Sequence, residues 1–257
     1  MTAIIIKSAA HAEQGPRERQ EDATLYDPAA RIFGVFDGLG GYKDGDKNST
    51  LAATYLLDCW SRDGEPRTPK GLTRAWDAAC ARLDSELPHG DTTATVGVVM
   101  GGGRCLLVLH AGDSGITRIS GQEVKRLTER HGEGHWVHRT MRGGHTRRRP
   151  IPSLRDKPDS HTVPLVAGDV LIMHTDGLDP ILSDTAALVE LCAERDPERL
   201  ARALCAEALA RGGDDNASCV VLIIEADPTA APASISREGL EAAGRWAGLG
   251  VDGGWVG

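Results

Sequence analysis

Short apolar runs and longer amphipathic stretches alternate along the chain. Strands are predicted where apolar and β-branched residues cluster, at 3–7, 32–37, 93–100, 104–110, 116–119, 123–127, 169–174 and 218–225. Helices are predicted where apolar residues recur at helical spacing, at 48–62 with Ser49 as the N-cap, and at 70–87, 185–194 and 197–211. Glycine turns join neighbouring runs as hairpins in the middle of the chain, which favours antiparallel sheets with helices packed outside them. The predicted class is α+β.

Two segments lack either pattern. Residues 128–164 are rich in His, Arg, Gly and Pro, which is typical of a functional flap or a mobile loop. Residues 227–257 begin as an Ala/Pro-rich linker and end in glycines, with a brief helix predicted at 238–247. We therefore expect one catalytic domain at 1–226 and a flexible tail at 227–257.

Composition narrows the class of protein. The chain has 257 residues and a net charge of −8, which argues against a broad nucleic-acid-binding surface. The six cysteines occur singly, so we expect reduced core residues rather than disulfides or a zinc site. No apolar run approaches the length of a membrane span and no leader pattern stands at the N-terminus. The expectation is a cytoplasmic monomer without nucleic-acid or membrane partners.

Candidate chemistry begins at Asp37, which ends an apolar run and is followed by Gly38, Gly40 and Gly41. A carboxylate at the end of a buried strand needs a compensating cation, a basic partner or solvent. The same arrangement recurs along the chain, at Asp113 after residues 106–112, at Asp176 after 170–175, at Asp215 before 219–224, and at Glu21 and Asp22.

Acidic residues at the ends of several strands can converge on one cleft. Oxygen ligands favour hard cations, so Mg²⁺ or Mn²⁺ fits better than zinc. Two such ions about 3.5–4 Å apart could share a carboxylate and a water, a geometry that serves phosphoryl hydrolysis. A single Asp-Gly at a strand end is usually only a turn, and the repetition is what favours a metal site.

Five motifs in order resemble those of the metal-dependent protein phosphatases, the protein phosphatase 2C family. They are Arg17-x-x-Gln20-Glu21-Asp22, Val35-Phe36-Asp37-Gly38-Leu39-Gly40-Gly41, Gly112-Asp113-Ser114, Thr175-Asp176-Gly177-Leu178-x-Pro180 and Asp215-Asn216. The resemblance implies a four-layer α-β-β-α sandwich with a Mn²⁺/Mg²⁺ centre at one end. It also implies hydrolysis of phosphoserine and phosphothreonine in proteins by a metal-bridging water, with a serine/threonine kinase as the source of the substrates.

The resemblance assigns roles to individual residues. Asp37 would bridge two metal ions, Gly38 would offer its carbonyl oxygen, and Asp176 and Asp215 would complete the site. Asp113 with Asp176 would hold a third, weaker ion. The remaining residues would support the site: Glu21 and Asp22 by binding or orienting metal-bound waters, Asn216 beside the ligands, and Arg17 by clamping the substrate phosphate with its planar donors.

One departure from the family pattern concerns the leaving group. Some relatives carry a histidine where this chain has Leu39, and that histidine is proposed to protonate the leaving alkoxide. Leucine cannot donate a proton, so the acid would be a metal-bound water or another group. Many bacterial relatives also have an apolar residue there, and the chain is expected to be of the bacterial type.

Other interpretations remain open. Ser8–Ala12 and Gly112–Gly115 superficially resemble the His and Ser motifs of chymotrypsin-like proteases, with Ser114 as the nucleophile. His131, His135 and His138 suggest a metal site, although a flap is the simpler interpretation. The basic run 147–149 could steer acidic phosphopeptides. A pseudo-phosphatase adaptor would have lost metal carboxylates, and none is lost here.

Overall fold

The computed structural model describes residues 3–39, 44–62, 67–133, 136–142 and 157–229. The predicted tail from residue 230 onward, with its helix at 238–247, lies outside the described residues, as do Gly40, Gly41, His135 and the basic run 147–149. The described helices and strands run from Ile4 to Ala226.

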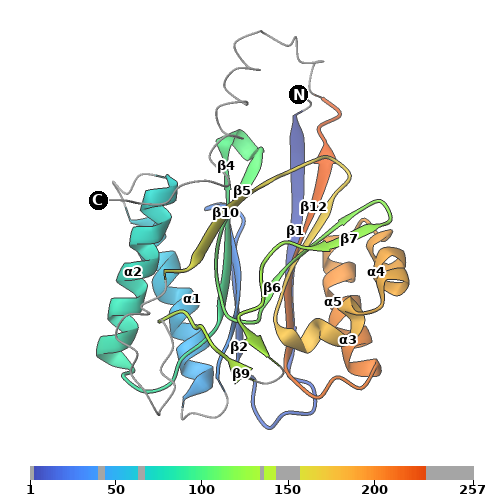
Figure 1. Cartoon of the computed structure of the whole chain (residues 1–257). Coiled ribbons are helices and arrows are strands. Elements are labelled where there is room, and N and C mark those ends of the chain that lie inside the picture. Colours follow the sequence, from blue (N-terminus) through green and yellow to red (C-terminus); the bar gives the residue numbers. More distant parts are fainter. Residues whose placement is uncertain (1–2, 40–43, 63–66, 134–135, 143–156, 230–257) are drawn as a thin grey trace.

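Two five-stranded antiparallel sheets form the centre of the molecule (Figure 1). The first contains, in spatial order, β1 (Ile4–Glu13), β12 (Ala217–Ala226), β11 (Val170–His174), β6 (Gly115–Ser120) and β7 (Glu123–Arg126). The second contains β10 (Asp159–Pro164), β5 (Cys105–Ala111), β4 (Ala94–Met100), β3 (Ile32–Asp37) and β2 (Asp22–Asp27). A short ribbon pairs β8 (Gly132–Glu133) with β9 (Trp136–Val137).

Helices cover the outer face of each sheet (Figure 1). The second sheet is covered by α1 (Gly45–Ser61) and α2 (Pro69–Glu86), and the first by α3 (Asp179–Leu182), α4 (Thr185–Cys192) and α5 (Pro197–Ala210). Short 3₁₀ turns at Gly101–Gly103 and Asp176–Leu178 complete the elements. The predicted α+β class and the four-layer α-β-β-α sandwich are confirmed.

Alternation along the central strands explains the four layers. In β3, Ile32 and Phe36 pack toward the helices, whereas Phe33 and Val35 pack toward the other sheet. β12 divides its residues in the same way, because Val221 belongs to the helix-covered core and its neighbours belong to the core between the sheets. Strands buried on both faces therefore appear as continuous apolar runs, which is why the sequence located them.

Sequence patterns missed four of the described strands, the short pair β8 and β9 and the longer β2 and β10, and misplaced one helix cap. β2 and β10 are edge strands with partly exposed polar residues, so they lack an apolar run, and β10 lies inside the segment predicted to be irregular. Ser49 is not the N-cap of α1, because the helix begins earlier and Asp44 occupies the cap position in a left-handed conformation. The buried Ser49 hydroxyl instead donates to the Glu21 carbonyl at 2.5 Å.

Two further features concern the class of protein, namely its cysteines and the apolar character of its helices. All six cysteines have free thiols, in agreement with the sequence. Among the described helices, none is both long and apolar enough to cross a membrane.

His110 is a neutral histidine buried inside β5. Its Nε2 lies 2.7 Å from the Glu129 carbonyl, which can only accept, so Nε2 carries the proton. The other ring nitrogen, Nδ1, lies 2.9 Å from Thr95 Oγ1 and accepts from that hydroxyl. Burial lowers the pKa of His110 to about 3.

This histidine should make the fold sensitive to acid. Below pH 6.5 the unfolded chain takes up a proton that the folded chain refuses, so the free energy of unfolding should fall by about 1.4 kcal/mol per pH unit as pH drops toward 3. In urea unfolding of the metal-free chain between pH 7 and 5, His110→Gln should flatten this dependence relative to the wild type. The control Thr95→Val keeps the ring and should keep the slope. An unchanged slope in His110→Gln would contradict the assignment.

Candidate active site: carboxylates where the two sheets meet

Three aspartates come together from different elements. Asp37 ends β3 in one sheet, and Asp176 begins the 3₁₀ turn after β11 in the other. Asp113 lies in the connection from β5 to β6, which crosses between the sheets. One carboxylate oxygen of each lies within 4.8 Å of the others. The convergence that the sequence predicted for these three residues is therefore present in the fold.

The electrostatics of this group favour a multivalent cation. Burial, with Asp22 and Asp176 nearby, raises the pKa of Asp37 well above its usual range. Burial and the neighbouring Asp113 raise the pKa of Asp176 to about 6. Asp113 itself is buried, and its Oδ1 has no hydrogen-bond partner. Since buried oxygens normally have partners, an unpartnered carboxylate oxygen in a residue of this group fits a bound hard cation.

Asp22 lies beside this group. It stands opposite Asp37 in the β2–β3 register, and its Oδ2 accepts from Thr175 Oγ1 at 2.8 Å. Burial, with Asp176 and Asp215 nearby, raises the pKa of Asp22 to about 8. The side chain is thus fixed beside the three aspartates by the residue that precedes Asp176.

Asp215 and Arg17 contact each other. Arg17 Nη2 donates to Asp215 Oδ2 at 2.6 Å, and Arg17 Nε donates to the Asp214 carbonyl at 2.7 Å. Asp215 is close enough to raise the pKa of Asp37, although it does not belong to the tight group around that residue. The predicted phosphate-binding residue and a predicted metal ligand therefore form an ion pair, which the sequence did not indicate.

Asn216 holds the segment that carries Arg17 and Glu21. Its Nδ2 donates to the carbonyls of Gln14 and Arg19 at 2.7 and 2.9 Å, and its Oδ1 accepts from the Glu21 amide at 2.8 Å. Burial and the nearby Asp46 raise the pKa of Glu21. Asn216 acts here through the backbone of the loop, fixing the position of Glu21.

Gly38 is fixed by close backbone packing. Its amide donates to the Glu21 carbonyl at 3.1 Å, and a Cβ at this position would lie 2.2 Å from the Gly45 carbonyl oxygen. No side chain fits in that space, so the glycine brings the end of β3 against the start of α1.

Arg130 is a site residue that the sequence did not reveal. Its Nη1 donates to Asp179 Oδ2 at 2.7 Å, and its Nη2 lies 3.8 Å from Asp113 Oδ2 and 3.8 Å from Asp176 Oδ2. The predicted third ion would share Asp113 and Asp176, where this guanidinium lies. A lone arginine in a segment without periodicity gave no signal.

The structure also bears on the two alternative sites, the protease-like site at Ser114 and the histidine metal site at His131. Ser114 is fully buried, and its hydroxyl bonds Thr93 Oγ1 at 2.6 Å, so it has neither the exposure nor the histidine of a protease nucleophile. His131 Nε2 lies 2.9 Å from Asp159 Oδ2 and serves to join two segments.

No protein-family model matches the chain. Over 230 residues it is 25% identical to "Probable protein phosphatase 2C 17" of Arabidopsis thaliana, covering 74% of this chain and 77% of that protein. Over 218 residues it is 24% identical to "Serine/threonine phosphatase stp" of Listeria monocytogenes, covering 76% and 84%. The catalytic domain of the serine/threonine protein phosphatase PstP, solved with two manganese ions, matches with a TM-score of 0.68 and 25% identity over 87% of this chain and all of that one.

The chain is similar to protein phosphatases of the 2C type. The matches to phosphatases along most of the chain, together with the sandwich and the carboxylate group, favour a phosphatase over a protease.

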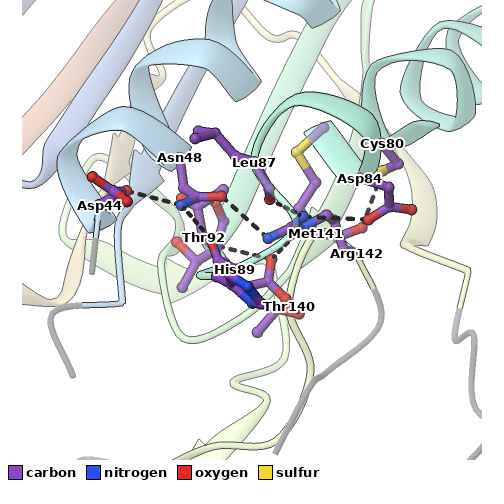
Figure 2. A network of polar contacts seen from close by, with 12 residues as sticks. Asp44, Asn48, Cys80, Asp84, Leu87, His89, Thr92, Thr140, Met141 and Arg142 are labelled. Atoms are coloured by element: carbon purple, nitrogen blue, oxygen red, sulfur yellow. Dashed lines mark hydrogen bonds and ion pairs between the residues drawn. The ribbon is translucent and has the colours of Figure 1, made fainter. Parts of the chain in front are cut away.

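A network of polar contacts surrounds Arg142 (Figure 2). Arg142 donates to the Leu87 carbonyl at 2.8 Å and to Asn48 Oδ1 at 3.2 Å, which joins the segment before residue 143 to α2 and α1. Its Nε lies 3.6 Å from Asp91 Oδ1, and only 2% of the Arg142 side chain and 4% of the Asp91 side chain are exposed. Thr140 Oγ1 donates to the other oxygen of Asp91 at 2.5 Å.

The network leads directly to the site. The Asp91 carbonyl accepts from the Leu39 amide at 3.1 Å. The next two residues bind Asp37: Thr92 Oγ1 and the Thr93 amide both donate to its carbonyl at 2.8 Å. Arg142 and Asp91 therefore fix the loop that holds the backbone of Asp37. Sequence reasoning missed them because their partners are far away along the chain.

Loss of Arg142 should destabilise the fold strongly. Arg142→Met would leave the Asp91 carboxylate buried beside an apolar side chain, at a cost of about 3–5 kcal/mol in urea unfolding. The control Lys7→Ala removes the exposed ion pair with Glu225 and should cost about 1 kcal/mol or less. Adding Asp91→Asn to Arg142→Met should recover part of the loss. If Arg142→Met and Lys7→Ala lowered the free energy of unfolding equally, the importance of this network would be contradicted.

Proposed function

We propose that the chain hydrolyses phosphoserine and phosphothreonine in proteins with the help of Mn²⁺ or Mg²⁺. The observation that carries the proposal is the group formed by Asp37, Asp113 and Asp176, whose oxygens lie within 4.8 Å of one another. Burial raises the pKa of all three, and repulsion within the group adds to this at Asp37 and Asp176, which favours cation binding over an empty, ionised group. The matches to serine/threonine phosphatases of the same family support the substrate class.

Two ions are assigned to this centre. Asp37 would be shared between them, Asp176 and Asp215 would complete the ligands, and the Gly38 carbonyl would contribute from the turn. When bound, such ions polarise phosphoryl oxygens and lower the pKa of water. Glu21 and Asp22, at the start of β2, have raised pKa values, which suit residues that accept or hold a proton.

Arg17 is assigned to the substrate phosphate. In the structure it bonds Asp215, an anion that cation binding would neutralise. Once Asp215 binds a metal, the guanidinium is available to a second anion, and its planar donors match phosphate oxygens in a bidentate way. The ion pair thus keeps the arginine beside the site before substrate arrives.

A pseudo-phosphatase adaptor is the second candidate. It would require the loss of metal carboxylates, whereas Asp37, Asp113, Asp176 and Asp215 are all present and three of them converge. Proteins phosphorylated by a serine/threonine kinase in the cytoplasm are the proposed substrates, and the proposed working form is a monomer.

Removing a central carboxylate should abolish turnover without unfolding the protein. Asp37→Asn and Asp176→Asn are each expected to eliminate Mn²⁺-dependent release of phosphate from a phosphothreonine peptide. Each should also raise the thermal stability of the metal-free chain at pH 8, because one of several repelling buried charges is gone. The control Asp58→Asn changes an exposed carboxylate on α1 and should do neither. Full activity in excess chelator would refute the proposal.

Replacing Arg17 should change both the turnover of substrate and the Mn²⁺ concentration that activity requires. Arg17→Ala should lower kcat/KM for the phosphopeptide about 10- to 100-fold, the range expected for a lost charge-assisted hydrogen bond. It should also lower the Mn²⁺ concentration needed for half-maximal activity, because Asp215 no longer pairs with a competing cation. Arg19→Ala alters an exposed neighbour and serves as the control. If Arg17→Ala changed the stability of the protein but left kcat/KM unchanged, the residue would have no part in substrate binding.

A further inference from the structure

The surroundings of Arg130 are inconsistent with a third metal ion. Three carboxylates face its guanidinium: Asp179 at 2.7 Å, and Asp113 and Asp176 each at 3.8 Å. Asp113 and Asp176 are the pair from which a third ion was expected. A divalent ion between them would have to lie against a permanent positive charge, and an arginine does not lose its proton in a protein.

The chain segment that carries Arg130 is anchored on both sides. The amide of the next residue, His131, donates to the Gly112 carbonyl at 2.8 Å, and the Gly112 amide donates back to His131 Nδ1 at 3.2 Å. Before it, the Leu127 amide donates to the Ile116 carbonyl at 2.7 Å. The backbone around Arg130 is therefore fixed to the same loop that carries Asp113.

The arginine is also enclosed along its length. Its side chain is 34% exposed, while its Nε is buried and has no hydrogen-bond partner. Asp113 Oδ1 is likewise buried without a partner. The carboxylates thus receive the positive charge chiefly through the two terminal nitrogens of the guanidinium. This is the position that a weakly held cation would take between Asp113, Asp176 and Asp179.

We propose that the Arg130 guanidinium is the permanent cation of the Asp113–Asp176–Asp179 group, so that this chain takes up two divalent ions and no third. The inference rests on the proposed two-ion centre and deepens it. Arg130 is a positioning residue: its guanidinium faces Oδ2 of Asp113 and of Asp176, and leaves their other oxygens to the two ions.

The test counts bound ions directly. Metal-free protein is dialysed to equilibrium against increasing Mn²⁺, and bound Mn²⁺ per chain is measured by atomic emission, with electron paramagnetic resonance as an independent count. The wild type should saturate at two ions. Arg130→Gln should bind a further, weaker ion, and adding Asp113→Asn should remove it again. Arg130→Lys keeps the positive charge and should stay at two.

A matched control comes from the same segment. Arg139 pairs with Asp159 at 2.5 Å, so Arg139→Gln removes an arginine charge away from Asp113 and Asp176 and should leave the count at two. A wild type with three ions, or an Arg130→Gln protein that still binds two, would overturn the role of Arg130 while leaving the two-ion centre intact. A wild type that binds no Mn²⁺ would instead overturn the proposed centre. Should Arg130→Gln fail to fold, the wild-type count and Arg130→Lys still decide.

Discussion

Repulsion among buried carboxylates is the constraint around which this site is built. Two unit charges 4 Å apart interact by about 4 kcal/mol at an effective dielectric constant near 20, so a group such as Asp37, Asp113 and Asp176 is costly when all members are ionised. The fold brings them within 4.8 Å of one another, and the raised pKa values express that cost. Such a group persists because the surrounding sandwich is stable enough to hold it.

Both sheets of the sandwich contribute to the position of the aspartates. Asp37 ends a strand of one sheet and Asp176 begins the turn that follows a strand of the other, so the core between the sheets determines their separation. Phe33 and Val35 of β3 pack in that core, together with Leu171 and Met173 of β11. Helix α1 adds a third constraint, because Gly38 lies too close to the Gly45 carbonyl for any side chain. Rigid packing on all sides prevents the carboxylates from relaxing apart.

How much the sequence could reveal depended on the range of each interaction. Strands with both faces buried, such as β3 and β11, carry continuous apolar runs and were located correctly. Edge strands were missed because their outer residues are polar, as in β10. The three converging aspartates were found because an aspartate beside a glycine after an apolar run is a local pattern that recurs. The arginines were not, since nothing near Arg130 or Arg142 in the sequence distinguishes them from surface arginines.

Three arginines pair with carboxylates in this structure, and they differ in how exposed their side chains are. Arg142 and Asp91 are both enclosed, although Arg142 also pairs with the exposed Asp84, and the buried pair supports the fold. Arg17 pairs with Asp215 while half-exposed, at 46% of its side chain, so the pair can exchange partners. Arg130 lies between these extremes, with 34% of its side chain exposed and its guanidinium facing three carboxylates. The more buried the arginine, the more its ion pair serves the fold, and the more exposed it is, the more easily the pair can exchange partners. A guanidinium is weakly hydrated and always charged, so it can stay paired with carboxylates permanently. Chemistry at phosphorus needs the higher charge density of a divalent ion.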